Sequence, residues 1–161
     1  MTKEEFIAIL DKEDYSYGIS RGRIVVTEED QDINLGSLTS LPPGVDFYNE
    51  WTVILNDLTS LPPDVEFYNG EHVYLQSLTS LPPDVEFNNG GGINLGSLTS
   101  ISHGVEFRNR GYVRLDSLTS ISPGFEFKNR GNVILKDWNG NIEGIDNKRL
   151  LNLMIKKEMF I

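Results

Sequence analysis

Apolar side chains recur along most of this chain with a period of 20 residues. Five consecutive blocks with small variations of the pattern VxLxSLTSLPPxVxFxN align without gaps, and a sixth block breaks off. The blocks begin at Ile33, Val53, Val73, Ile93, Val113 and Val133. A unit of this length cannot bury its apolar side chains alone, so the blocks are expected to stack and share one core. The sequence therefore predicts a repeat solenoid over residues 33–138.

Alternation within each block predicts two short β-strands. Residues 65–69 and residues 73–76 both alternate apolar side chains with outward-facing ones, which is the period of a half-buried strand. The prolines after each LTS motif and the Asn-Gly or Arg-Gly pairs near the block end predict bends between the strands. The expected fold class is mainly β, with parallel sheets built by the stacked blocks.

A column of asparagines repeats at the second bend of every block. We expect these side chains to satisfy backbone groups inside the turn rather than to hold a ligand or a metal. The column consists of Asn49, Asn69, Asn89, Asn109 and Asn129.

The N-terminal segment, residues 1–32, differs from the repeat and predicts a cap. Thr2 and Glu5 have the spacing of a capping box at the start of a helix of about three turns. Phe6 and Leu10 lie on the apolar face of this helix, and a β-hairpin is expected to follow with its turn at Arg21-Gly22. A cap of this kind protects the first strands of a parallel array from unwanted pairing.

The C-terminal segment, residues 139–161, predicts a second cap. Asp146 is a suitable N-cap for a helix over residues 147–157. Trp138 replaces a repeated leucine and is expected to close the core column. The two caps and the solenoid between them are interpreted as one structural domain.

The LTSLP repeats resemble leucine-rich repeats, especially the short bacterial type found in secreted ubiquitin ligases, and are similar to SLTSLP arrays of uncharacterised bacterial and phage proteins. The resemblance covers about residues 33–138. It implies no catalytic residue, because the chemistry of those ligases belongs to a separate cysteine domain. The asparagine column follows VxF instead of the LxL strand of the family. Both a leucine-rich horseshoe and a flatter β-helix therefore remain open.

Composition excludes several kinds of chemistry. The chain has no cysteine, so a disulfide framework, a thiolate metal site and a cysteine nucleophile are ruled out. The two histidines, His72 and His103, have no serine and carboxylate at triad-like spacing. We expect no enzymatic activity and no cofactor. Because neither a membrane span nor a secretory signal is recognisable, the expected location is cytoplasmic.

Charge is distributed unevenly along the chain, whose formal net charge is −10. Residues 24–107 contain no lysine or arginine, whereas the later blocks are basic. An acidic column with members in every block is expected to face solvent and consists of Asp46, Glu66, Glu86, Glu106 and Glu126. This balance argues against direct binding to nucleic acid or an anionic membrane.

Outward positions that differ between blocks suggest a function. Aromatic side chains in the early blocks are predicted to lie beside the acidic column, which is a composition typical of protein-binding hot spots. The predicted binding residues are Asp46, Tyr48, Trp51, Glu66, Tyr68, Tyr74, Glu86 and Glu106. The sequence thus favours a non-enzymatic protein–protein interaction module whose protein partner has a basic surface.

Three other possibilities follow from the same features. The acidic surface is also compatible with an inhibitor that imitates nucleic acid and occupies a DNA- or RNA-binding protein, as in conflict between phage and host. A carbohydrate-binding β-helix is a further alternative, and it requires stacked aromatic rings in a groove. The acidic early blocks and basic late blocks also permit a homo-oligomer formed by head-to-tail docking.

Overall fold

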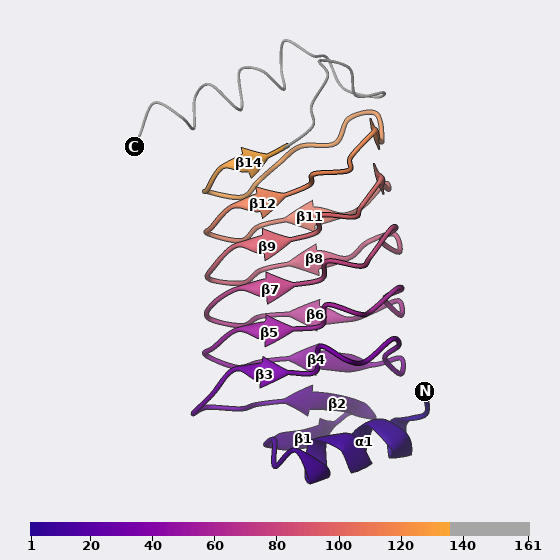
Figure 1. Cartoon of the computed structure of the whole chain (residues 1–161), viewed down its shortest axis with the longest axis vertical. Coiled ribbons are helices and arrows are strands. Elements are labelled where there is room, and N and C mark those ends of the chain that lie inside the picture. The colour runs from indigo at the N-terminus through magenta and orange to yellow at the C-terminus, as the bar shows by residue number, and fades with distance from the viewer. Residues whose placement is uncertain (136–161) are drawn as a thin grey trace.

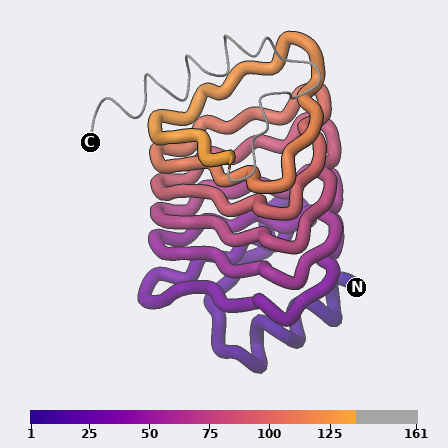
Figure 2. Tube along the Cα trace, turned by 45° about the horizontal axis from the view of Figure 1, so that its top comes forward, coloured from indigo at the N-terminus to yellow at the C-terminus, as the bar shows by residue number. Residues whose placement is uncertain are grey.

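The structure, a computed structural model, describes residues 1–135, and these form a straight stack of coils behind an N-terminal cap (Figures 1 and 2). Two six-stranded sheets lie on opposite faces of the stack. The first sheet has the order β1 (Tyr17–Ser20), β2 (Arg23–Val26), β4 (Val45–Phe47), β6 (Glu66–Phe67), β8 (Glu86–Phe87) and β11 (Glu106–Phe107). The second sheet has the order β3 (Ile33–Asn34), β5 (Val53–Ile54), β7 (Val73–Tyr74), β9 (Ile93–Asn94), β12 (Val113–Arg114) and β14 (Val133–Ile134). The predicted fold class, a mainly β solenoid of parallel strands, is confirmed.

The 20-residue period of the sequence is the register of the second sheet. Val53 lies opposite Ile33, and Val73 lies opposite Val53. Backbone bonds tie each coil to the next, as in the 2.9 Å bond from the Val53 amide to the His72 carbonyl. Because each strand places one apolar residue inward at the same height, every coil buries the same columns of side chains.

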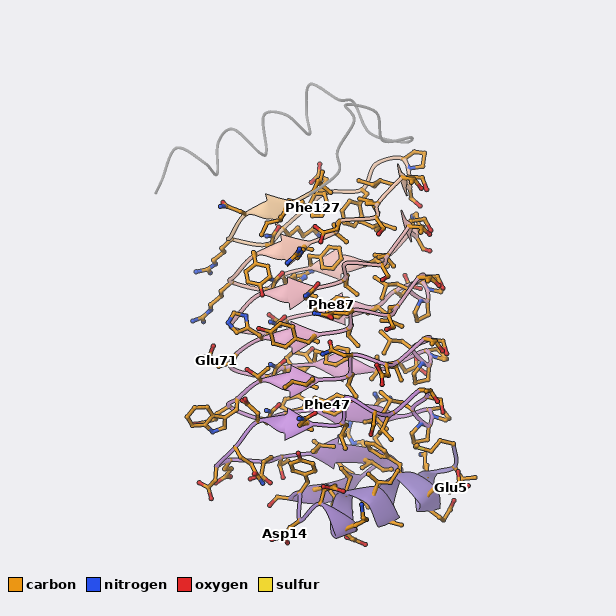
Figure 3. The ribbon with its side chains drawn as sticks, in the orientation of Figure 1. Glu5, Asp14, Phe47, Glu71, Phe87 and Phe127 are labelled. Carbon is orange, nitrogen blue, oxygen red and sulfur yellow. The ribbon has the colours of Figure 1, made fainter. Side chains whose placement is uncertain are left out.

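Stacked phenylalanines form the centre of the core (Figure 3). The rings of Phe47 and Phe67 are parallel with centroids 5.3 Å apart, and Phe87 and Phe107 continue the stack at similar spacing. All four are fully buried. Offset stacking of this kind adds to the energy of apolar burial. The core therefore repeats coil by coil, as the leucine and phenylalanine columns predict.

The proline bend ends in a left-handed residue in each coil. Gly44, Gly104 and Gly124 have φ angles between 74° and 82°, and Asp64 and Asp84 occupy the same position at 68° and 61°. Glycine and, less readily, aspartate tolerate this conformation. The bend predicted after the LTS motif is confirmed.

A third, short ladder forms only in the last coils, between β10 (Ser100–Ile101) and β13 (Ser120–Ile121). In the earlier coils the next residue is a proline, such as Pro82, which has no amide hydrogen to donate. Ser122 replaces this proline, and its amide donates to the Ile101 carbonyl at 3.0 Å. The sequence analysis did not predict this ladder.

The N-terminal cap has the predicted helix and hairpin. Helix α1 (Lys3–Lys12) begins with a complete capping box between Thr2 and Glu5, and it buries Phe6 and Leu10. β1 and β2 pair antiparallel around the Arg21-Gly22 turn, and β2 then pairs parallel with β4. The hairpin thus occupies the open edge of the first sheet.

Several predictions concern the C-terminal part of the chain. Asp146, the helix over 147–157 and the closing role of Trp138 all lie outside the described residues. Within residues 1–135, no helix is long and apolar enough to cross a membrane.

Candidate interaction surfaces

The outer face of the first sheet carries two columns of side chains beside each other. Inward-pointing Phe67 separates Glu66 from Tyr68 along β6, and the other coils repeat this alternation. One column is acidic and contains Asp46, Glu66, Glu86 and Glu106. The other column changes along the stack and contains Tyr48, Tyr68, Asn88, Arg108 and Lys128. Along the stack from the N-terminal cap, one column of this face therefore changes from aromatic to basic, while the other column stays acidic.

Tyr48 and Tyr68 form an exposed aromatic pair. Their ring centroids are 4.7 Å apart with an interplanar angle of 22°, and their exposed fractions are 47% and 36%. Partial burial, followed by the charge of Glu66, raises the pKa of each hydroxyl above its usual value. Each ring covers one face of the other, and both residues remain exposed on the outer surface.

A shallow groove of about 640 Å³ lies between the N-terminal hairpin and Tyr48 of this aromatic pair. Ile19 and Val25 provide apolar lining from the hairpin, while Tyr48, Asp46 and Glu66 line it from the first coils. The Ile19 side chain is 60% exposed, the highest value among the large hydrophobic residues described. The groove exists because β1 extends the first sheet beyond the repeated coils.

Most of the acidic column is already paired. Asp46 accepts hydrogen bonds from the Arg23 guanidinium and is only 4% exposed. The expectation that Asp46 faces solvent is therefore wrong, because Arg23 from the hairpin lies over it. The sequence pattern did not reveal this contact, since Arg23 precedes the repeat.

Basic side chains of the late coils reach back to the same column. The Arg108 Nε lies 2.5 Å from Glu106 and 3.2 Å from Glu86, and the Lys128 Nζ lies 2.7 Å from Glu106. Hydrogen bonds from Lys128 and Arg108 lower the pKa of Glu106 below its usual value. Glu66 forms no ion pair within 4.0 Å among residues 1–135. The exposed acidic charge of this face is thus concentrated near Glu66.

The structure separates two of the predicted aromatic residues from this face. Tyr74 lies on β7 of the second sheet, where its ring is 6.0 Å from His72. Trp51 lies at the corner between the sheets, and its Nε1 donates to the Glu29 carbonyl at 2.7 Å. The predicted binding residues therefore belong to three surfaces, and only Tyr48 and Tyr68 accompany the acidic column.

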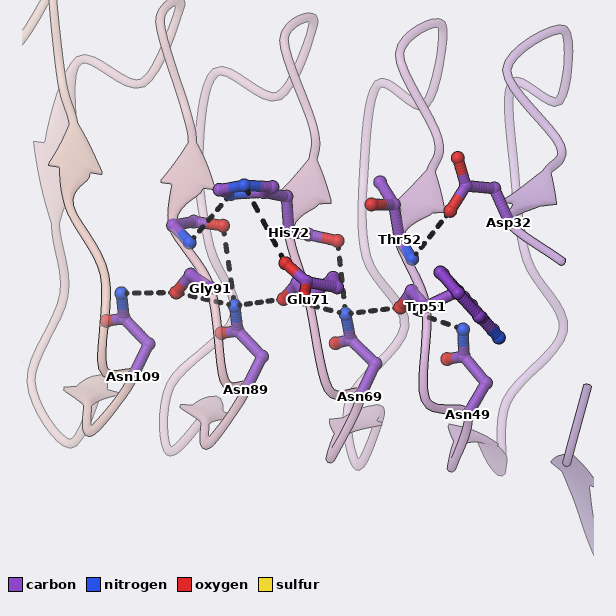
Figure 4. A network of polar contacts seen from close by, with 11 residues as sticks. Asp32, Asn49, Trp51, Thr52, Asn69, Glu71, His72, Asn89, Gly91 and Asn109 are labelled. Atoms are coloured by element: carbon purple, nitrogen blue, oxygen red, sulfur yellow. Dashed lines mark hydrogen bonds and ion pairs between the residues drawn. The ribbon is translucent and has the colours of Figure 1, made fainter. Parts of the chain in front are cut away.

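The asparagine column forms a buried ladder at that corner (Figure 4). The Asn69 Nδ2 donates to the carbonyls of Glu71 and His72 in its own coil and to Trp51 in the preceding coil, at 3.0–3.1 Å. Asn89 and Asn109 repeat this arrangement. The prediction that this column satisfies backbone groups inside a turn is confirmed.

Sequence reasoning missed Ile19 as a candidate binding residue. The only signal was its place in a hairpin that was expected to cap the array, and the apolar character of Ile19 suggested burial. Its exposure arises because β1 is the last strand of the sheet and α1 covers other positions.

Both histidines lie at turns, where one accepts a hydrogen bond and the other is exposed. The His72 Nδ1 accepts a 2.8 Å hydrogen bond from the Gly92 amide, and His103 is exposed at the proline bend. Residues 1–135 hold no group of three or more histidine, cysteine, aspartate or glutamate side chains arranged to bind a metal ion.

The described part of the chain is thus a capped parallel β-solenoid with a groove beside its N-terminal hairpin. No protein-family model, no curated protein and no solved structure matches this chain.

Proposed function

We propose that this protein is a non-enzymatic interaction module that binds a protein partner on the outer face of its first sheet. The proposal rests chiefly on the exposure of Ile19 and Tyr48, which line one groove, and of Tyr68, which stacks on Tyr48 next to it. Exposed apolar and aromatic side chains gathered beside charged groups are typical of protein-binding hot spots. Scattered single side chains would not support such a role, whereas Ile19 and Tyr48 line a common hollow and Tyr68 stacks on Tyr48.

Charge complementarity favours a partner with a basic surface. Arg21 and Arg23 also line the groove, but Arg23 is paired with Asp46, whereas Glu66 beside Tyr48 has no ion pair of its own among residues 1–135. A lysine or arginine of the partner would pair with Glu66 while an apolar residue contacts Ile19. Electrostatic attraction of this kind raises the rate of association and helps to select the partner.

The two alternative functions receive less support from the same surface. An inhibitor that imitates nucleic acid needs a continuous negative face, but Asp46, Glu86 and Glu106 are neutralised by basic neighbours. A carbohydrate site needs aromatic faces on which sugars stack, and the mutual stacking of Tyr48 and Tyr68 occupies one face of each ring. The interaction module agrees better with both observations.

Binding measurements with matched variants test the proposal. A partner captured from the native lysate is identified and purified, and its dissociation constant is measured against wild type, Ile19→Ser, Tyr68→Ala and Ile134→Ser over a salt series. Ile134 is 40% exposed on the second sheet and serves as the matched control. Truncating a hot-spot residue costs about 2 kcal/mol or more, so the Ile19 and Tyr68 variants should bind roughly 30-fold more weakly.

The outcomes separate the candidate functions. Weaker binding by the Ile19 and Tyr68 variants, with Ile134→Ser unchanged, supports the groove as the binding site. If the dissociation constant is unchanged by both substitutions but moderate salt releases the partner, the proposal is contradicted. That result favours an inhibitor that imitates nucleic acid. Circular dichroism of each variant confirms that the fold is retained.

A further inference from the structure

A recess of about 390 Å³ lies where the first sheet turns into the asparagine corner, and its lining extends along the stack from Asn69 to Arg130. Its basic lining comes from Arg108, Arg110 and Arg130, and its remaining walls include Gly70 and Gly90. No function has been assigned to this recess in the preceding sections. Three guanidinium groups around one hollow are unusual in a chain with a net charge of −10.

Two positions in the lining of this recess are glycines that cannot carry a side chain. A Cβ at Gly70 would lie 2.2 Å from the Glu50 carbonyl oxygen, and a Cβ at Gly90 would lie 1.9 Å from the Gly70 carbonyl oxygen. These coils approach each other too closely at this corner for any residue other than glycine. Gly70 and Gly90 therefore contribute only backbone to the lining of the recess, beside the neighbouring arginines.

In the next two coils, the closely packed glycine stands one residue later in the repeat. There the glycines are Gly111 and Gly131, whose Cβ atoms would lie 2.4–2.5 Å from backbone atoms of the preceding coil. The position that is glycine in the earlier coils becomes Arg110 and Arg130. A change from Asn-Gly to Asn-Arg-Gly thus places two arginines in one column beside the glycine-lined hollow.

The arginines of this column have no acidic partner in the described structure. Arg110 and Arg130 occupy equivalent positions one coil apart, and neither forms an ion pair within 4.0 Å in residues 1–135. Stacked coils are separated by about 4.8 Å, so two like charges in one column repel each other. Arg108 differs, because Glu86 and Glu106 hold its Nε. An anion in the recess would remove the repulsion between Arg110 and Arg130.

We propose that this recess binds an oxyanion, a carboxylate or phosphate group, between the guanidinium groups of Arg110 and Arg130. The planar fork of a guanidinium matches two oxygens of either group and forms charge-assisted hydrogen bonds with them. Arg108 borders the site and stays fixed by its carboxylates. This inference does not depend on the protein-binding groove, which lies on the early coils.

Titrations followed by NMR test the site with defined probes. The side-chain Nε–Hε resonances of the arginines are recorded at low ionic strength while sodium phosphate, sodium pyrophosphate or sodium succinate is added. Wild type is compared with Arg110→Gln, Arg130→Gln and the matched control Arg21→Gln. Arg21 is an exposed arginine in the hairpin turn, far along the chain from the recess and without an ion pair among the described residues.

We expect saturable shifts of the Arg110 and Arg130 resonances with at least one probe. Losing a charge-assisted hydrogen bond costs enough to weaken binding at least about tenfold in Arg110→Gln and Arg130→Gln, whereas Arg21→Gln should bind as wild type does. Saturation by phosphate or pyrophosphate alone identifies a phosphate-bearing ligand, and saturation by succinate alone identifies a carboxylate.

Two results would overturn the proposal. One is a set of small, unsaturated shifts that are equal at Arg21, Arg110 and Arg130, which indicates general screening by added ions. The other is equal affinity in wild type and both recess variants. Unchanged backbone amide spectra of the variants establish that any loss of binding comes from the site itself and not from unfolding.

Discussion

Asn89 shows how a single side chain holds a corner of the solenoid. The chain turns from the first sheet to the second at residues 89–92, where backbone hydrogen bonds between coils, such as the 3.0 Å bond from the Val73 amide to the Gly92 carbonyl, are supplemented by the asparagine side chain. The Asn89 Nδ2 donates to the carbonyls of Glu71, Gly91 and Gly92 at 3.0–3.3 Å, and the residue is 1% exposed. A buried polar group without such a partner is costly.

Replacing Asn89 with alanine should therefore destabilise the protein. The substitution removes the side-chain hydrogen bonds to three carbonyls, each of which keeps one backbone donor, and we expect the free energy of unfolding to fall by about 1–3 kcal/mol. Asn88→Ala is the matched control, because Asn88 is exposed and its side chain forms no hydrogen bond in the described structure. Urea unfolding curves measure both changes. Equal midpoints for the two variants would contradict a structural role for the ladder.

Asp46 marks the limit of what sequence predicts about a residue. Its place in the repeat correctly indicated an outward direction, because it follows Val45 and precedes buried Phe47. Its burial by Arg23 depends on the hairpin that pairs with β4, a contact between non-repeating and repeating segments. Periodicity carries no information about such a contact.

At the scale of elements, the repeat correctly predicted where the strands lie. It did not predict which of the two sheets, and therefore which surface, each strand belongs to. The two strands of each coil, the bends and the stacking register all follow from patterns that recur every 20 residues. The assignment of Tyr74 and Tyr68 to one surface failed because the Asn-Gly corner reverses the chain between β6 and β7. The β10–β13 ladder was overlooked although its signal, the change from proline to Ser122, was present in the sequence.

The corner glycines are required by the close approach of neighbouring coils. A Cβ at Gly111 would lie 2.5 Å from backbone atoms of Gly91 and Gly92, and these atoms cannot move without displacing a coil. Gly111→Ala should lower the free energy of unfolding by about 1–3 kcal/mol or more. Gly18→Ala, where nothing lies within 4 Å of the added atom, should change it by less than about 0.5 kcal/mol. Thermal and urea unfolding of both variants provide the comparison, and a similar loss in each would contradict the packing argument.

At the scale of the whole molecule, charge is organised in two ways. Short ion pairs link the late basic residues to the acidic column, while the corner of the early coils keeps exposed acidic residues such as Glu29, Asp30 and Glu50. The predicted head-to-tail homo-oligomer stays a prediction, and Arg108 and Lys128 are less available for it because they are already paired. Among the basic residues of the late coils, Arg110 and Arg130 form no ion pair within residues 1–135 and are available to an external anion.

The balance between repulsion and ion pairing predicts how salt affects stability. Exposed ion pairs contribute little, whereas repulsion among unpaired carboxylates acts over about 30 Å at 0.01 M salt and about 3 Å at 1 M. With a net charge of −10, we expect sodium chloride to raise the Tm by several degrees, at roughly 2–4 °C for each kcal/mol of repulsion removed. Circular dichroism at increasing salt measures this shift, and a falling Tm would show that ion pairs dominate.

The recess arginines provide the control for this prediction. Chloride bound between Arg110 and Arg130 would also stabilise the folded state, so the rise in Tm has two possible origins. Changing both arginines to glutamine makes the protein more negative and removes the anion site at once. If screening of repulsion is the cause, the double variant gains more stability from salt than wild type does. If chloride binding is the cause, it gains less, and the direction of the difference decides between them.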